Sequence, residues 1–322
     1  MRKYVSIAIT TLFLFAFGFA NGQGYTFRVL ANKGQNKVKK AGSTAAVPLK
    51  TGATLNAEDQ LIASQGAYIG LMHKTGKTLE VRTAGTKKVS ELEKQVNTKT
   101  TSVTSRYAQF LANKMNEKEK PGYRSRLNAT GAAKRALGGD EVIQVLIPSP
   151  EDSLESIAIG DNAIVSWDTP EGMEVNTFIV TIKNIFDEEI MKEEVNGNSI
   201  NLDFNSERMQ NEEGLYIIEV AAKENMEVTS GDGLAIRKLS AEEAAQYEDG
   251  LASLKSEVPE DSPLSQVIYA SYYEENGLIV DALTAIENAI KMNPDVDDFK
   301  VLKKDIIERN GIKVYKEKAG DE

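Results

Sequence analysis

The residue types that most often carry out catalysis are scarce in this chain. Its 322 residues include a single histidine, His73, and no cysteine. A Ser-His-Asp triad would depend on His73, while a multi-histidine metal site, a cysteine-ligated metal and thiol catalysis all lack their side chains. Because His73 lies in an alternating stretch beside a turn, we expect it at the surface or rim of a strand. The composition favours a protein that is not an enzyme and uses no cofactor or metal.

Acidic residues, in contrast, are abundant, because the chain has 48 aspartates and glutamates. Such a number offers many pairs that could act as acid and base in glycoside hydrolysis. No local pattern singles out one pair, and Asp168 after Trp167 is typical of the turn that follows a strand. An envelope hydrolase that uses such a carboxylate pair is therefore one alternative function, and it would need a cleft that contains a carboxyl group of raised pKa.

Two short stretches approach ligand-binding motifs without matching them. "GLMHKTGKT" (70–78) has five residues between its glycines where a phosphate-binding loop has four, and the alternating "TLEVRT" follows where that loop needs a helix. A hairpin turn at Thr75-Gly76 explains the same residues. "DVDD" (295–298) lacks the central glycine and distal glutamate of a calcium loop, so we expect it to cap the N-terminus of the last helix.

Residues 1–22 have the organisation of a cleaved signal peptide. Arg2 and Lys3 precede an apolar run from Val5 to Ala20, and Ala20-Asn21-Gly22 places small residues at a cleavage site. The apolar run is shorter than the roughly 20 residues that span a bilayer. We therefore expect a mature chain that begins near Gln23, has no membrane span, and resides in the periplasm or elsewhere in the bacterial cell envelope.

Residues 23–89 are expected to form an antiparallel β domain. Alternating runs such as "YTFRVL", "QLIAS" and "AYIGLMHKTGKTLEVRT" are separated by glycines at intervals typical of hairpins. Within this region, "VPLKTGATLNAEDQLIASQGAYIGLMHKTGKTLEV" resembles the bacterial FecR-like domain. The resemblance lies in Gly52 with Leu55, in Asp59 before Leu61 and Ile62, and in the hairpin at Thr75-Gly76.

Residues 90–140 change in character. Tyr107, Phe110, Leu111 and Met115 recur at helical spacing, and the "PGYRSRLNATGAAKRALGGD" that follows is rich in glycine and basic residues. We expect short helices followed by a basic linker.

Residues 141–239 return to alternation, in the runs "VIQVLI", "NAIVSW", "NTFIVTI", "NSINLDF", "GLYIIEVAA" and "GLAIRKL". Six or more short strands in about a hundred residues predict a β-sandwich. "AIVSWDTPEG", followed by "NTFIVTI" and "GLYIIEVAA", resembles a fibronectin type III module, which has an immunoglobulin-like (Ig-like) sandwich. The resemblance implies a core position for Trp167 and a place in an alternating strand for Tyr216, and such modules usually space or bind.

Residues 240–322 are expected to be helical, with helices around 240–256, 264–276, 279–292 and 297–309. This end resembles the 34-residue tetratricopeptide repeat (TPR), whose packing positions and closing proline correspond to Ala270, Tyr273, Gly277, Ala282, Ile286, Ala289 and Pro294. "EENG" at 274–277 also returns as "ERNG" at 308–311. About one and a half repeats are too few to stand alone, so the hairpin should pack on a neighbouring domain or a partner. The predicted fold is thus multidomain, with two antiparallel all-β domains followed by an α-helical TPR-like end.

Charge is distributed unevenly along the chain. Residues 23–140 carry 21 basic and 8 acidic side chains, a net charge of +13, whereas residues 141–322 carry 15 and 40, a net charge of −25. The basic segment either holds an anionic envelope polymer or an acidic protein, docks on the acidic half of its own chain, or is simply solvated. We expect no nucleic acid partner, because aromatic residues are not interleaved among the basic ones.

These expectations combine into an exported cell-envelope scaffold or adaptor protein that mediates protein–protein contacts. The candidate contact residues are Tyr269, Tyr272 and Tyr273 in the helical hairpin and Arg124, Arg126, Lys134 and Arg135 in the basic linker. Tyr273 also occupies a packing position. The alternative is a carbohydrate- or peptidoglycan-binding envelope protein that uses its β domains, which a low aromatic content of 7% disfavours.

Overall fold

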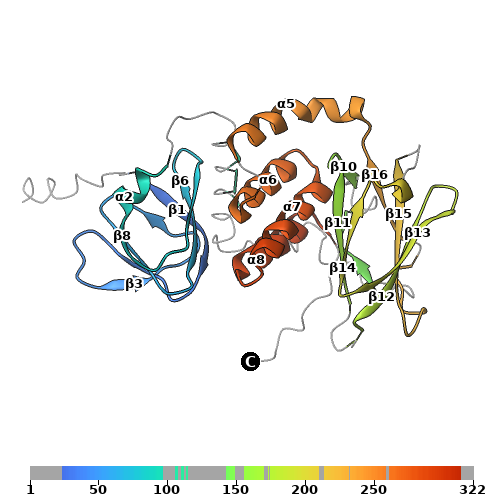
Figure 1. The fold of residues 1–322 in the computed structure, drawn as a ribbon, viewed down its shortest axis with the longest axis horizontal. Coiled ribbons are helices and arrows are strands. Elements are labelled where there is room, and N and C mark those ends of the chain that lie inside the picture. The colour runs from blue at the N-terminus through green and yellow to red at the C-terminus, as the bar shows by residue number, and fades with distance from the viewer. Residues whose placement is uncertain are drawn as a thin grey trace, which may run out of the picture.

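The protein consists of two β units and a helical region that lies between them in space. The computed structural model describes residues 24–96, 106–107, 110–111, 114, 143–148, 156–169, 173, 175–209, 214–231, 233–258 and 261–312. In Figure 1 the C-terminal helices occupy the centre, with the N-terminal β unit on the left and the second β unit on the right. Antiparallel β structure followed by a helical end is therefore confirmed, and the helical end stands between the β units rather than beyond them.

The N-terminal β unit contains two four-stranded antiparallel sheets. Its strands are β1 (Phe27–Lys33), β2 (Lys37–Lys39), β3 (Ala46–Pro48), β4 (Thr54–Leu55), β5 (Gln60–Ala63), β6 (Tyr68–His73), β7 (Thr78–Val81) and β8 (Gly85–Lys88). One sheet has the order β4-β1-β6-β7 and the other β3-β2-β5-β8, and a short helix, α2 (Val89–Glu93), follows β8. Phe27, Leu61 and Leu71 are among the residues that fill the common core. The alternating runs of the sequence supply this core, because successive side chains of a strand point to opposite faces.

The turn between β6 and β7 has the predicted hairpin geometry. Gly76 adopts a φ of 88°, a left-handed conformation that glycine takes without strain. The backbone N–H of His73 donates to the carbonyl of Lys77 at 2.7 Å, which closes the hairpin. A strand, β7, follows the turn where a phosphate-binding loop would need a helix.

Between the β units, five described residues are helical: Arg106, Tyr107, Phe110, Leu111 and Lys114. Tyr107 and Leu111 are buried in the core of the C-terminal helices. Helical spacing in this segment is thus confirmed at these positions, while Met115 lies outside the described residues.

The second β unit places a five-stranded sheet against a three-stranded one around a single core. Its strands are β9 (Gln144–Val145), β10 (Ile157–Ala158), β11 (Asn162–Asp168), β12 (Thr177–Lys183), β13 (Glu189–Asn196), β14 (Ser199–Asp203), β15 (Leu215–Ala222) and β16 (Leu234–Lys238), with a 3₁₀ turn, η2 (Glu207–Met209), after β14. The sheet orders are β10-β16-β15-β12-β13 and β14-β11-β9, and only the β10–β16 pair among them is parallel. Trp167 lies in the core, fully buried, with its ring edge-to-face on Phe178 at 5.3 Å. The expected position of this tryptophan is confirmed.

Two strands of this unit, the two-residue β10 and the longer β13, were not expected from the sequence. Strand β13 is the more informative of the two. Its residues, "EIMKEEVN", pair with β12 in the register Val180↔Glu193 and form the edge of the five-stranded sheet. Most of its side chains are exposed, so the strand has no alternating apolar pattern. Charged residues are common on edge strands because they discourage pairing with other chains.

The C-terminal helical region contains α5 (Ala241–Glu257), α6 (Pro263–Glu275), α7 (Ile279–Met292) and α8 (Asp297–Arg309), within two residues of the predicted limits. Ser240 and Glu243 form a capping box at the start of α5, and Ser262 caps α6 with proline at its first position. Ala270, Ala282 and Ala289 are buried, so these helices approach closely at small residues. Within the ranges described, no helix is both long and apolar enough to cross a membrane.

The two copies of the repeated tetrapeptide form equivalent turns. Asn276 donates through its side chain to the carbonyl of Tyr272, and Asn310 donates in the same way to the carbonyl of Ile306. Each asparagine precedes a glycine of positive φ, Gly277 at 76° and Gly311 at 70°. The copies also bind one another, because Arg309 donates two hydrogen bonds of 2.8 Å to the carboxylate of Glu274. The sequence repeat thus corresponds to a repeated helix end.

Candidate functional site

The residues that connect the helical region to the two β units form the candidate functional site. Helix α8 contacts β1 and α6 contacts β7, whereas α7 contacts β10 and β11. We call the contact with the N-terminal β unit the first joint, which joins Asn32, Lys33, Tyr68, Gly70 and Glu80 to Ser262, Leu264, Asp295, Asp298 and Phe299. We call the contact with the second β unit the second joint, which joins Ile159, Gly160, Ile164 and Ser166 to Asp281, Thr284 and Lys303.

The second joint is organised around the buried carboxylate of Asp281, which lies in the first turn of α7. Its two oxygens accept hydrogen bonds from the backbone N–H of Ile159 at 3.0 Å and of Gly160 at 2.8 Å. The ammonium of Lys238 donates to the carbonyls of the same two residues. Burial raises the pKa of Asp281 to about 6, against the lowering effect of the two N–H donors and of Lys238.

Glycine at position 160 leaves room for this contact. A Cβ atom on Gly160 would lie 2.7 Å from Oδ1 of Asp281, which is too close for any real side chain. The chain thus places a residue without a side chain where the helix carboxylate meets the backbone of the β unit.

Further contacts extend the second joint along β11. The backbone N–H of Ile164 donates to the hydroxyl of Thr284 at 3.0 Å. Lys303 on α8 donates to the hydroxyl of Ser166 at 2.9 Å and forms an ion pair with Glu287 on α7. Two helices are therefore fastened to one strand by polar groups that are all at least half-buried.

The first joint combines an apolar core with polar contacts at its edge. Tyr68 packs edge-to-face on Phe299 at 5.9 Å, and a Cβ atom on Gly70 would lie 2.6 Å from Cδ2 of Leu264. Strand β6 is consequently buried on both faces, one toward its own β unit and one toward the helices. An apolar contact of this kind does not depend on charge.

The polar part of the first joint uses the start of α8. The backbone N–H of Asn32 donates to Oδ2 of Asp298 at 2.7 Å, and Lys33 forms an ion pair of 2.8 Å with Asp295. The prediction that "DVDD" caps this helix with a side chain is wrong, because the cap position is Val296 and no side chain caps the helix. Asp295 and Asp298 instead contact β1, whereas Asp297 pairs with Lys300 on the same helix. Asp297 and Asp298 do lie in the first turn of α8, where acidic side chains match the helix dipole.

Glu80 is the second polar element of the first joint. Its carboxylate accepts hydrogen bonds from Tyr68 at 2.9 Å and Ser262 at 2.7 Å, and Arg82 donates to it twice, at 2.7 and 3.0 Å. Burial alone would raise the pKa of Glu80, but the hydrogen bonds from Ser262, Arg82 and Tyr68 hold it below its usual value. Burial and the neighbouring Glu80 carboxylate raise the pKa of Tyr68.

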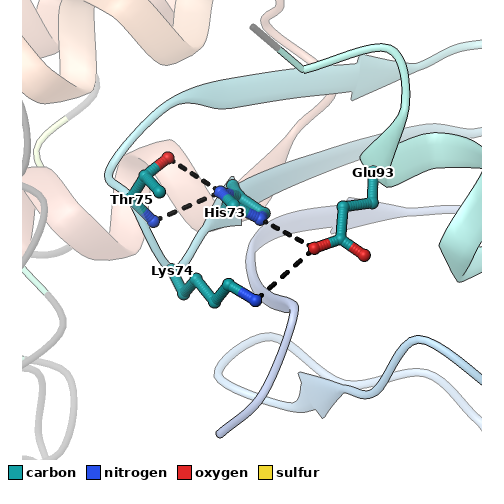
Figure 2. A network of polar contacts seen from close by, with 4 residues as sticks. All are labelled: His73, Lys74, Thr75 and Glu93. Atoms are coloured by element: carbon teal, nitrogen blue, oxygen red, sulfur yellow. Dashed lines mark hydrogen bonds and ion pairs between the residues drawn. The ribbon is translucent and has the colours of Figure 1, made fainter. Parts of the chain in front are cut away.

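His73, the sole histidine, lies away from the surface in a network that Figure 2 shows in close view. Its Nδ1 accepts from the backbone N–H of Thr75 at 3.2 Å and lies 2.7 Å from the Thr75 hydroxyl, while Nε2 lies 3.4 Å from Glu93. Lys74 approaches the same Glu93 oxygen at 3.5 Å. The expected rim position is wrong, because the side chain of His73 is only 1% exposed.

This network has the order hydroxyl, imidazole and carboxylate, but its geometry is structural. The turn that contains Thr75 folds back onto the histidine of its own hairpin, and Phe27 packs edge-to-face on the ring at 5.3 Å. A ring enclosed in this way offers no approach to a substrate. The contact between His73 and Glu93 instead fastens the β6–β7 hairpin to α2.

The tyrosines predicted as contact residues lie in the helical core. Tyr269 and Tyr272 are buried, and their hydroxyls donate to the carbonyls of Val258 and Tyr247 at 2.7 and 2.8 Å. Tyr273 is partly buried and packs against the same core. None of the three therefore presents a freely exposed ring.

The four basic residues predicted as contacts, Arg124, Arg126, Lys134 and Arg135, lie outside the described residues. The described ion pairs nevertheless connect the basic and acidic portions of the chain. Lys33 pairs with Asp295, Lys77 with Glu257, and Arg106 with Glu275.

Sequence reasoning missed the carboxylates of both joints. One signal was present for Asp281, since it is the one charged residue in the run "LIVDAL" at 278–283. A charge within an apolar helical run indicates a buried partner. No comparable signal distinguished Asp298 from the other acidic residues of the acidic half.

No protein-family model matches the sequence, and a search of curated proteins finds no match.

Proposed function

We propose that this chain is an exported cell-envelope scaffold or adaptor protein without enzymatic activity, whose helical region fixes two β units relative to each other while their outer surfaces contact other proteins. One observation carries the proposal. The paired helices α7 and α8 use Asp281 to bind the second β unit and Asp298 to bind the N-terminal unit. A chain that uses its helices in this way holds two binding modules at a set separation.

The domain types that we propose are a FecR-like domain, a fibronectin type III-like module and a TPR-like end. Strand order supports the second of these, since β9, β11 and β14 share one sheet and β12, β15 and β16 the other, as do strands A, B, E and C, F, G of Ig-like folds. Tyr216, near the start of β15, donates to the carbonyl of Met209 at 2.7 Å, which is the contact of a tyrosine corner. Such modules are usually spacers or binding units.

The FecR-like assignment is supported by the acidic residue of its motif. Asp59 is buried, and it accepts hydrogen bonds from the backbone N–H of Asn56 and Ala41 and from Lys40. The TPR-like assignment is supported by the equivalent helix ends at Gly277 and Gly311.

Exposed apolar residues on the β units mark where a partner would contact the scaffold. Phe186, at the turn between β12 and β13, is 66% exposed, and Val47 on β3 is 50% exposed. An exposed aromatic side chain such as Phe186 belongs to a residue class that is enriched at protein interfaces.

Site-specific photo-cross-linking in cells tests the proposal. A photoreactive residue at Phe186 or Val47 is expected to give a discrete adduct with an envelope protein. The same residue at Val301, which is 45% exposed on α8, is the matched control and should give none. Absence of protein adducts from both β positions would contradict an adaptor function.

A further inference from the structure

A cleft lies at the edge of the first joint, beside the hydrogen bond of Ser262 to Glu80. It encloses about 290 Å³ between β7 and the segment where α5 ends and α6 begins. Lys77, Thr78 and Glu80 line it from the N-terminal β unit, and Glu257, Ser262 and Ser265 line it from the helical region. Its volume is near the lower end of the range for small-molecule sites.

The charges that line the cleft compensate one another. Lys77 lies 3.4 Å from the carboxylate of Glu257, and Arg82 neutralises the carboxylate of Glu80 through two hydrogen bonds. The remaining acceptor positions of Glu80 are used by Tyr68 and Ser262. The charged side chains of the cleft therefore leave no surplus charge with which to select an ion, and Val258 adds an apolar group to the lining.

Two hydroxyl groups of the cleft have no partner in the described part of the chain, those of Thr78 and Ser265. Ser265 is only 1% exposed, so most of its surface is shielded from bulk water, while its hydroxyl makes no hydrogen bond to another described residue. An unpaired buried hydroxyl costs free energy that a bound polar group recovers. Each of these hydroxyls can donate one hydrogen bond and also accept.

We infer that this cleft binds a small, neutral, hydroxyl-rich ligand such as a sugar. Sugar hydroxyls both donate and accept, so they match Thr78 and Ser265, can accept from Lys77, and can donate to Glu257. A small anion would meet the carboxylates of Glu257 and Glu80, and a small cation would meet Lys77. The inference is independent of the scaffold function, because it uses none of the residues at Phe186 or Val47.

Titration of the mature full-length protein with glucose and with N-acetylglucosamine tests the inference, with nuclear magnetic resonance shifts of the Thr78 and Ser265 amides as the readout. We expect saturable shifts with at least one of the two sugars at roughly millimolar concentrations, as befits a small polar ligand. Ser265→Ala and Thr78→Val should each weaken binding about fivefold, the loss of one hydrogen bond.

Matched variants separate the cleft from general effects. Ser256→Ala removes a hydroxyl that bonds to Ser253 near the end of α5, and Thr177→Val removes one on β12. Both should bind the sugar as the parent does, and the melting temperature of every variant is measured to confirm folding. Three outcomes would overturn the inference: no saturable shift with either sugar, binding that Ser265→Ala and Thr78→Val leave unchanged, or saturation by acetate or ethylammonium but by neither sugar.

Discussion

The carboxylate of Asp281 lies 2.8 Å from the backbone nitrogen of Gly160, which is 121 residues earlier in the chain. This contact joins the N-terminal turn of α7 to the loop between β10 and β11. Both residues are specialised for it, since the carboxylate is buried and the glycine leaves room for its oxygen. The second joint is thus a fixed contact between an acidic helix and the backbone of a β unit.

Asp281 makes the stability of this joint depend on pH. Its pKa is raised from 3.8 in the unfolded chain to about 6 in the folded protein, so the folded state retains a proton that the unfolded state releases. The stabilisation that this proton gives to the folded protein is therefore full below about pH 4. As the pH rises from about 4 through 6, that stabilisation, about 3 kcal/mol of the free energy of unfolding, is lost. Urea unfolding at pH 4.5 and 7.5, followed by the fluorescence of Trp167, measures it.

Two substitutions test whether Asp281 causes this pH dependence of stability. Asp281→Asn is uncharged at both pH values, so its stability should lack this part of the pH dependence. Asp297→Asn is the matched control, because Asp297 lies in the first turn of α8 with a side chain that is 86% exposed, and it should keep the slope of the parent. Identical slopes for the parent and Asp281→Asn would contradict the assignment.

Ala289 tests the close packing of the helices. It is fully buried in the core of the helical region, and Ala289→Glu would bury a charge or force the helices apart. We expect a loss of several kcal/mol and a clearly lower melting temperature. Met292→Glu, at a position on the same helix that is 43% exposed, should change the melting temperature little. Equal effects of the two substitutions would count against a closely packed hairpin.

Processing of the N-terminus remains a prediction from the sequence, because residues 1–23 lie outside the described part of the chain. Mass spectrometry of the protein isolated from its native cells should find an N-terminus near Gln23. A chain that retains Met1 in the membrane fraction would show that export with cleavage does not occur.

The sequence predicted local structure more fully than the joints. Strands with one buried face and the limits of the helices were predicted because their signals lie within a few residues. The expected helix start at 240 falls on Ser240, which the structure shows as the N-cap of α5. The edge strand β13 was missed because its exposed residues lack an apolar pattern. The contact of Asp281 with Gly160 could not be predicted, since it depends on how distant elements pack. For the same reason, the sequence could not show that Tyr269 and Tyr272 face the core.

We expect the first joint to be insensitive to salt concentration. Docking of the basic portion on the acidic portion through charge alone would weaken as the Debye length falls from about 10 Å at 0.1 M salt to about 3 Å at 1 M. The structure contains such pairs, but Lys33 and Asp295 are 37% and 74% exposed, and pairs of this kind contribute at most about 1 kcal/mol. Tyr68 and Phe299 pack in the apolar core of the same joint. Small-angle scattering should therefore show nearly constant dimensions between the two salt concentrations.

Phe299→Ala is expected to have the opposite effect. Removal of a fully buried aromatic ring from this core should cost about 3–5 kcal/mol, enough to loosen the first joint and to increase the radius of gyration at both salt concentrations. Simultaneous reversal of Arg124, Arg126, Lys134 and Arg135 to glutamate is the control for the basic linker, and it should leave the dimensions unchanged. Expansion of the parent protein in 1 M salt, or of the reversed variant in 0.1 M salt, would instead show that charge holds the two portions together, because apolar contacts of the Tyr68–Phe299 type are not weakened by screening.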